Sequence, residues 1–175
     1  MAQFPVALLI AIRTIDSFIG WTGKITAWLI APLVVGVTYE VIVRYAFNAP
    51  TTWAYDLSYM LYGGHFMLCA AYALLHKAHI RTDVFYAKWS PRRQGLVDAV
   101  LYLFFFFPGM IFFFFSGWES AYHSWQIHEV SDATAWRPYV YPLKMAVPVA
   151  AVLLLVQGVS EFLKSVYAAL NGEWL

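Results

Sequence analysis

Residues 99–118 decide the fold class: they read AVLYLFFFFPGMIFFFFSGW and contain no Asp, Glu, Lys or Arg. A helix that crosses a bilayer needs about 20 mainly apolar residues, and this run has that length. Three further runs lack the same four residue types, namely residues 57–76, 145–160 and 25–39. The sequence therefore predicts an all-α integral membrane protein with four transmembrane helices.

The composition excludes several other classes of protein. Of the 175 residues, 62% are hydrophobic and 12% are charged, whereas a soluble domain carries about 25% charged residues. A soluble enzyme and a disordered chain are therefore excluded. The formal net charge of +1 provides no field for polyanions, so we expect no nucleic-acid partner. Cys69 is the single cysteine and lies in an apolar run, where we interpret it as a small buried hydrophobic residue rather than part of a disulfide or zinc site.

Turn signals and charges divide the chain into its expected spans. We predict a single membrane domain, residues 1–175, with spans of about 24–47, 52–76, 96–118 and 139–164. The turn signal Asn48-Ala49-Pro50 is so short that the first two spans must form an antiparallel hairpin.

The N-terminal segment is too long for one span. The apolar pattern continues to Phe47, and as one helix it would be about twice as long as a bilayer core is thick. We expect a break at Gly20 and Gly23, which leaves an amphipathic helix of about residues 4–20 in the membrane interface; a helix protruding into water is the alternative. No basic residue precedes the apolar start and no small-x-small cleavage pattern is present, so we expect the segment to be retained.

Loop charges predict the orientation. Residues 76–95 contain five Lys or Arg and one Asp, whereas residues 119–136 contain three acidic residues and no Lys or Arg. Basic loops stay on the cytoplasmic side of a membrane. Loop 77–95 and both termini are therefore predicted to be cytoplasmic, and loop 119–138 periplasmic.

Few charged residues fall inside the predicted spans, and such residues are often functional. Glu40 and Arg44 are four residues apart near the end of the first span, and Asp56 lies just across the hairpin turn. An ion or proton relay is one interpretation. We favour a structural clamp of Glu40, Arg44 and Asp56, because a relay would need further acids deeper in the spans, and we identify none.

Other polar and aromatic residues in the spans allow more than one interpretation. His65 is the only histidine deep in a span, and a haem anchor normally needs two at matching depth; we favour packing, or a hydrogen bond to a partner subunit. Gln157 is expected to bond to a neighbouring helix or a partner. The phenylalanines of residues 104–107 and 112–115 surround their helix, so they contact lipid or a larger membrane partner, and Pro108-Gly109 between them permits a kink.

The order of several short motifs resembles the small membrane subunit of tripartite ATP-independent periplasmic (TRAP) transporters. That family shows an Arg-Tyr-x-Phe group, a turn, a tryptophan and an acidic residue, then a His-Ile-x-x-Asp signature and a Trp-x-Pro segment before the last span. The residues that carry the resemblance here are Tyr45, Phe47, Asn48, Pro50, Trp53, His79, Asp83, Trp136, Pro138 and Gln157. The family often has Glu where this chain has Asp56, which keeps the charge but shortens its reach.

The resemblance implies a noncatalytic subunit without a cofactor, in the bacterial inner membrane. Such a subunit braces a large TRAP permease subunit during sodium-coupled uptake of an organic acid, which a periplasmic substrate-binding protein delivers. Its other expected partner is membrane lipid. Residues expected to contact the binding protein are Asn48, Thr51, Glu129, Asp132 and Arg137. Two other classes stay open: a membrane anchor for a redox enzyme, and a small self-sufficient transporter or channel.

Overall fold

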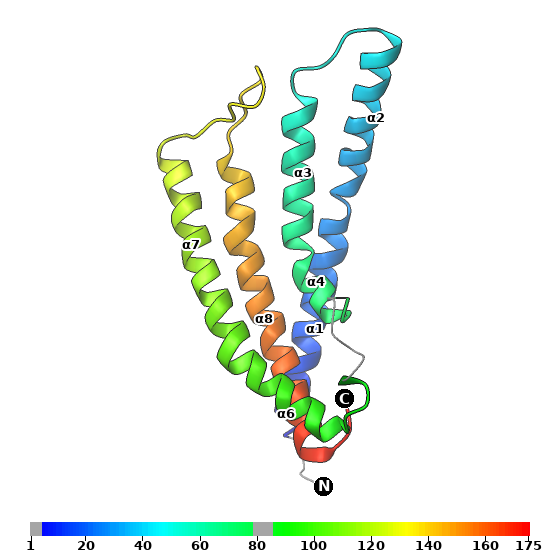
Figure 1. The fold of residues 1–175 in the computed structure, drawn as a ribbon, viewed down its shortest axis with the longest axis vertical. Coiled ribbons are helices and arrows are strands. Elements are labelled where there is room, and N and C mark those ends of the chain that lie inside the picture. The colour runs from blue at the N-terminus through cyan, green and yellow to red at the C-terminus, as the bar shows by residue number, and fades with distance from the viewer. Residues whose placement is uncertain (1–4, 79–85) are drawn as a thin grey trace. The chain divides into compact units, whose positions relative to one another are not determined.

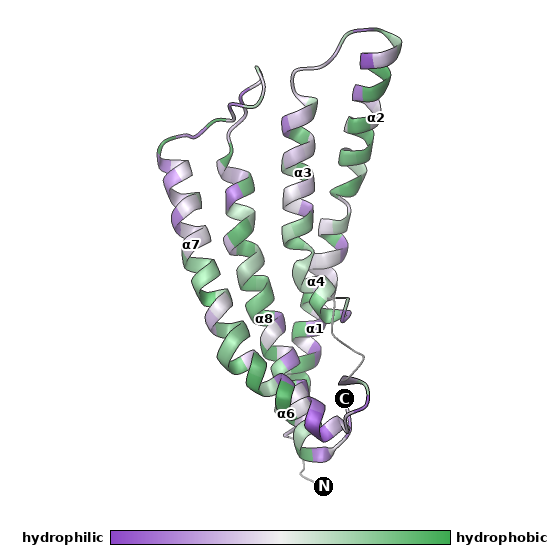
Figure 2. Ribbon diagram, viewed as in Figure 1, coloured by the Kyte–Doolittle hydropathy of each residue, from purple (hydrophilic) through white to green (hydrophobic). Residues whose placement is uncertain are grey.

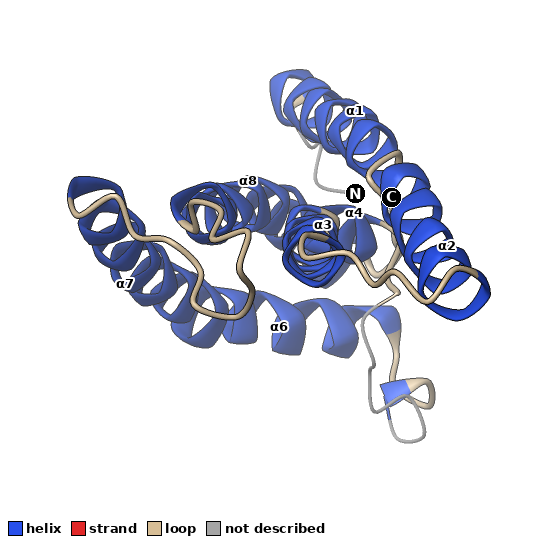
Figure 3. Ribbon diagram, turned by 90° about the horizontal axis from the view of Figure 1, so that it is seen from above, coloured by secondary structure: helices blue, strands red, loops and turns tan. Residues whose placement is uncertain are grey.

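Helices make up most of the part of the chain that the structure describes. A computed structural model describes residues 5–78 and 86–175, so the motif residues His79 and Asp83 lie outside the described residues. The helices are α1 (Val6–Ala27), α2 (Ile30–Ala46), α3 (Ala54–Leu68), α4 (Ala70–Leu75), α6 (Pro91–Leu101), the π-helix η1 (Tyr102–Phe106), α7 (Phe107–Gln126) and α8 (Tyr141–Asn171). Within the described ranges there is no strand, only an isolated bridge between Val130 and Tyr139 (Figure 3). The all-α prediction is confirmed.

Among the described residues, three helical stretches are long and apolar enough to cross a membrane: Val6–Ala46, Pro91–Gln126 and Tyr141–Asn171. Figure 2 shows hydrophobic residues along most of α2 and α8. The predicted span of about 52–76 is divided at Cys69 into α3, with 15 residues, and α4, with 6. The count of four spans and the orientation of the termini remain predictions.

The N-terminal helix is interrupted between Ala27 and Ile30, and Pro32 rather than a glycine accounts for the interruption. Helix α1 passes through Gly20 and Gly23 and ends at Ala27, so the break expected at these glycines is wrong, and residues 6–20 are the first part of α1 rather than a separate helix. Around Trp28 and Leu29 the chain makes i to i−3 hydrogen bonds, including Ala31 N to the Trp28 carbonyl at 3.1 Å. A proline ring clashes with the carbonyl four residues earlier, which for Pro32 is that of Trp28. An interior glycine costs only about 1 kcal/mol.

The contacts within the chain group it into two compact units, where the sequence analysis expects one membrane domain. Unit 1 comprises residues 1–22, 71–113 and 151–175, and unit 2 comprises residues 23–70 and 114–150. Unit 1 therefore holds most of α1, α6 and the second part of α8. Unit 2 holds α2, α3, the second part of α7 and the loop that follows it.

In unit 2 the predicted hairpin of α2 and α3 is present. Gly36 of α2 faces Leu57 and Trp53, because a Cβ atom at Gly36 would lie 3.9 Å and 4.0 Å from these side chains. The rings of Tyr39 and Trp53 stack with centroids 5.9 Å apart. The two helices lie side by side and are joined by the turn at Asn48 (Figure 1).

In unit 1 the phenylalanine-rich helix adapts to Pro108 through a π turn. Pro108 has no N–H to offer the carbonyl of Phe104, and η1 over Tyr102–Phe106 comes directly before α7. Phe107 packs edge-on against Phe106 and against Phe162 of α8. Many of the other phenylalanines stay exposed on this chain, including Phe105 at 72% and Phe112 at 75%. Their contact with lipid or with a larger membrane partner stays a prediction.

Helices α6 and α8 approach so closely at Gly95 that no side chain fits between them. A Cβ atom at Gly95 would lie 2.5 Å from the Ser165 carbonyl oxygen and 2.6 Å from the Ala169 nitrogen. Arg92, one turn earlier, donates to the carbonyls of Ala169 and Leu170 at 3.1 and 3.0 Å. The C-terminal tail joins the same contact, because Trp174 Nε1 donates to Gln94 Oε1 at 3.1 Å.

We predict that Gly95→Ala lowers the free energy of unfolding by about 1–3 kcal/mol, because the obstructing atoms are backbone and cannot rotate away. The control is Gly109→Ala, since a Cβ atom there meets nothing within 4 Å and alanine favours the helix by up to about 1 kcal/mol. Thermal melting of the purified protein in detergent measures both. Equal melting temperatures for the two variants would show that the α6–α8 contact is looser than described.

Candidate functional site

The turn between α2 and α3 is fixed by the carboxylate of Glu40. Arg44 Nε donates to Glu40 Oε1 at 2.8 Å, and an Arg44 terminal nitrogen lies 2.5 Å from the same oxygen. The other oxygen, Glu40 Oε2, accepts hydrogen bonds from the Thr51 backbone N–H at 3.1 Å and from the Thr51 hydroxyl. Glu40 is 9% exposed. The carboxylate therefore joins the last turn of α2 to the far side of the hairpin turn.

Asn48 makes this turn possible. Its φ of 52° lies in the left-handed region, which asparagine tolerates better than most residues. The backbone N–H groups of Phe47 and Ala49 both bond to the Val43 carbonyl, at 3.3 and 3.2 Å, which ends α2 in the way that a left-handed residue permits. Pro50 then leads the chain to Thr51.

Asp56 does not join Glu40 and Arg44 as the clamp prediction expects. It is 2% exposed and accepts hydrogen bonds from the Ser131 hydroxyl at 2.6 Å and from the Thr134 hydroxyl, 75 and 78 residues away in the sequence. Asp56 thus ties the start of α3 to the loop between α7 and α8. The structure brings together two of the three expected residues and gives the third a different partner.

The loop between α7 and α8 holds three of the residues expected to contact a binding protein. Glu129 Oε2 lies 2.5 Å from Lys144 Nζ, and Asp132 Oδ1 lies 2.9 Å from Arg137. Backbone bonds close the loop, with Ser131 N to the Pro138 carbonyl at 2.8 Å and Val140 N to the Glu129 carbonyl at 2.9 Å. Their contact with a binding protein, like that of Asn48 and Thr51, remains a prediction.

The other motif residues of unit 2 differ in their exposure. Tyr45 and Phe47 at the end of α2 are 81% and 73% exposed. Trp136 is 46% exposed and its backbone N–H bonds to the Thr134 hydroxyl at 3.3 Å. Pro138 accepts the bond from Ser131. The hairpin end therefore carries large aromatic surface that this chain alone does not cover.

A second polar cluster, in unit 1, was missed by the sequence analysis. Lys164 Nζ of α8 lies 2.8 Å from Asp16 Oδ2 of α1 and 2.7 Å from Glu161 Oε1. Gln157 Nε2 donates to Asp16 and to Glu161, both at 3.1 Å, and the Ser160 hydroxyl donates to Asp16 at 2.7 Å. Gln157 and Ser160 are 0% exposed and Glu161 is 3% exposed. Asp16 is therefore bonded to three side chains of α8.

The spacing of the α8 residues could have predicted this polar cluster from the sequence. Gln157, Ser160, Glu161 and Lys164 follow at i, i+3, i+4 and i+7, which places them on one helix face. Asp16 and Glu161 lie in two of the stretches long and apolar enough to cross a membrane, so the expectation that the spans hold no further acids is wrong. Gln157, expected to bond to a neighbouring helix or a partner, bonds to α1 and to its own helix.

His65 satisfies a backbone carbonyl beside the helix break in unit 2. Its Nδ1 lies 3.2 Å from the Thr26 carbonyl oxygen, and since a carbonyl only accepts, Nδ1 carries the proton. Cys69 Sγ lies 3.2 Å from the Thr26 hydroxyl and 3.7 Å from His65 Nδ1. This hydrogen bond lies within the chain and gives His65 a structural role next to the end of α1.

Comparisons with known proteins give one family. The family model described as "Tripartite ATP-independent periplasmic transporters, DctQ component" matches residues 33–167. No curated protein matches the chain. The matched range contains Glu40, Arg44, Asp56, the loop between α7 and α8, and the polar face of α8.

We predict that Lys164→Met strongly destabilises the protein, because it leaves two carboxylates facing each other without a cation. Breaking a buried ion pair costs about 3–5 kcal/mol when burial is complete, and somewhat less here because Asp16 is 27% exposed. Adding Asp16→Asn should restore part of the loss. Lys88→Met, at an exposed residue, is the control. Melting temperatures of the variants in detergent measure these effects. Equal decreases for Lys164→Met and Lys88→Met would contradict a stabilising role of the polar cluster.

The Glu129–Lys144 pair predicts a pH-dependent contribution to stability. The hydrogen bond from the Lys144 ammonium lowers the pKa of Glu129 from its ordinary value of 4.5. A lowered folded-state pKa means that the stabilisation is present above pH 4.5 and is lost as the pH falls through the folded-state pKa. Both side chains are about one-third exposed, so we expect less than about 1 kcal/mol. The melting temperatures of wild type and Glu129→Gln should differ at pH 7 and converge as the pH falls through the lowered folded-state pKa of Glu129; a difference that stays constant with pH would contradict the assignment.

Proposed function

The chain belongs to the DctQ component family of the tripartite ATP-independent periplasmic transporters, and from this membership we propose that it is the small, noncatalytic subunit of a binding-protein-dependent transporter. Its role is to brace the large permease subunit in the bacterial inner membrane. The large subunit moves an organic acid inward, coupled to sodium entry, after a periplasmic binding protein has delivered it. The observation that carries the proposal is the family match over residues 33–167.

The distribution of polar groups supports a bracing role. Glu40, Asp56 and Asp16 each bond to a segment distant in the chain or to the far side of a turn. These carboxylates fix helices and loops against one another, and each is engaged by donors of the same chain. Such groups stabilise a scaffold, since a transported ion or acid would have to displace those donors.

The aromatic surface supports assembly with a larger membrane protein. Tyr45, Phe47, Phe105, Phe112 and Phe115 are between 63% and 81% exposed on the isolated chain. Exposed apolar side chains of this size are suited to packing against another membrane-spanning protein as well as against lipid. We propose that the large permease subunit covers part of this surface. The predicted four-span, multi-pass arrangement belongs to the same proposal.

Reconstitution tests the proposed function. The chain is co-expressed with the large permease subunit and the binding protein of its own host, and the purified membrane proteins are placed in liposomes with an inward sodium gradient. Uptake of labelled dicarboxylates, 2-oxo acids, sugar acids and aromatic acids is then measured with and without the chain. We expect uptake of one class that requires all three proteins and sodium. Undiminished uptake without the chain, or failure of the chain to co-purify with the large subunit, would contradict the proposal.

In this system we predict that Arg44→Leu lowers the yield of the assembled complex. Glu40 then keeps Thr51 as a donor but loses the guanidinium that neutralises it, and the turn next to the exposed Tyr45 and Phe47 loosens. Arg44→Lys should be milder, because it keeps the charge and loses the planar fork. Lys88→Leu is the control. Complex yield and uptake at the level of this control would show that Arg44 has no role in assembly.

A further inference from the structure

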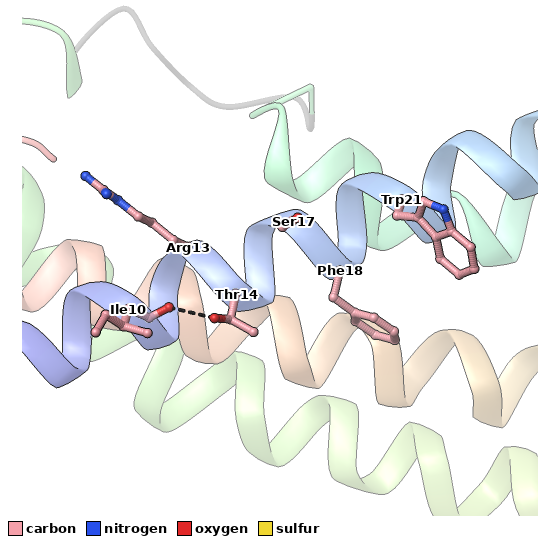
Figure 4. Close-up of a pocket in the computed structure, with 6 residues that line it drawn as sticks. All are labelled: Ile10, Arg13, Thr14, Ser17, Phe18 and Trp21. Carbon is pink, nitrogen blue, oxygen red and sulfur yellow. Dashed lines mark hydrogen bonds between the residues drawn. The ribbon is translucent and has the colours of Figure 1, made fainter.

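One face of α1 forms an open hollow that neither polar cluster uses. Six residues line it, at spacings of three and four that place them on one side of the helix: Ile10, Arg13, Thr14, Ser17, Phe18 and Trp21 (Figure 4). All six belong to unit 1 and to a stretch that is long and apolar enough to cross a membrane. The hollow therefore combines one guanidinium and two hydroxyls with apolar side chains on a single helix face.

Arg13 is the unusual member of this face. Within the described residues it is exposed and has no ion pair or hydrogen bond to its side chain, and Asp16, the acid on the next turn, is already engaged by Lys164. An unpaired arginine in an apolar helix is costly, so such residues find an anion or a polar partner. Ser17, one turn further along, is also exposed. The Thr14 hydroxyl donates to the Ile10 carbonyl at 2.9 Å.

The apolar part of the hollow begins beyond these polar groups. Phe18 and Trp21 are 47% and 64% exposed, and Trp21 lies eight residues after Arg13, which is about 12 Å along the helix. From Arg13 to Trp21 the face thus changes from cationic through hydroxyl-bearing to aromatic. A phospholipid has the same order of chemistry: an anionic phosphate, then ester groups, then an acyl chain.

We propose that this face of α1 binds one anionic phospholipid, with its phosphate at Arg13 and an acyl chain along Phe18 and Trp21. The planar guanidinium matches the geometry of a phosphate and can donate two hydrogen bonds to it. The Ser17 hydroxyl is placed to donate to an oxygen below the phosphate. Free phosphate would leave the two aromatic side chains uncovered, whereas a lipid covers both parts of the hollow.

Native mass spectrometry of the full chain, purified with its co-purifying subunits, tests the proposal. The protein is titrated with phosphatidylglycerol and, in parallel, with phosphatidylcholine of the same acyl chains. We expect one phosphatidylglycerol per chain to bind in preference to phosphatidylcholine. A basic side chain near the membrane surface contributes about 1 kcal/mol to attraction of anionic lipid, so Arg13→Gln should weaken this binding about fivefold. Arg13→Lys should keep part of the affinity, and Trp21→Ala should weaken the binding of both lipids.

The matched control is Arg93→Gln, which removes the same charge from an exposed arginine of α6 outside the hollow. It should leave the single tight phosphatidylglycerol in place, and 10 mM inorganic phosphate should not compete with the lipid. Equal losses in the Arg13 and Arg93 variants would overturn the proposal in favour of diffuse attraction. Competition by inorganic phosphate would overturn it in favour of a simple anion site. Unchanged lipid binding together with loss of a co-purifying subunit in Arg13→Gln would assign the face to a protein partner instead.

Discussion

The structure depends on one constraint: a polar side chain in an apolar helix must find a polar or charged partner, because the hydrocarbon of a membrane offers none. Lys164 shows this most clearly, since its ammonium lies between Asp16 of α1 and Glu161 of its own helix, at 2.8 and 2.7 Å. The pairing selects one helix face of α8 to point at α1. It also fixes the register of the two helices in unit 1, because Gln157 and Ser160 bond to the same carboxylate from the preceding turns.

The same constraint explains how the hairpin end of unit 2 is organised. Glu40 is satisfied from two directions, by Arg44 on its own helix and by Thr51 beyond the turn. Asp56 forms no ion pair within the described part of the chain and instead accepts hydrogen bonds from two hydroxyls of the loop between α7 and α8. The two acids thus have different structural roles: Glu40 closes the hairpin turn, and Asp56 anchors the loop between α7 and α8. This arrangement suits a component whose proposed role is to hold a surface in place.

Local features of this fold could be predicted from the sequence, and pairings between distant segments could not. The charge-free runs predict the all-α class, and the Asn48-Ala49-Pro50 turn signal predicts the hairpin. The four-residue spacing of Glu40 and Arg44 predicts their ion pair. Asp56 was assigned the wrong partner because closeness in sequence favoured Arg44, whereas Ser131 and Thr134 lie more than seventy residues away. The helix break was placed at glycines, although Pro32 carries the stronger steric reason.

The family match covers only part of the polar cluster of unit 1. The matched range begins at residue 33, directly after Pro32, and includes Gln157, Ser160, Glu161 and Lys164. Asp16 lies before that range, although three side chains of this polar face, Gln157, Ser160 and Lys164, bond to it. Within α8 itself, Glu161 and Lys164 form a complete i, i+3 ion pair at 2.7 Å. Asp16 therefore adds a second carboxylate to a pair that is already neutral.

The buried donors Gln157 and Ser160 stabilise this second carboxylate, because they supply two hydrogen bonds where a second cation is missing. The polar face of α8 thus holds α1 through hydrogen bonds as much as through charge. Because Asp16 is engaged by α8, Arg13, one turn away on α1, has no acid to pair with among the described residues.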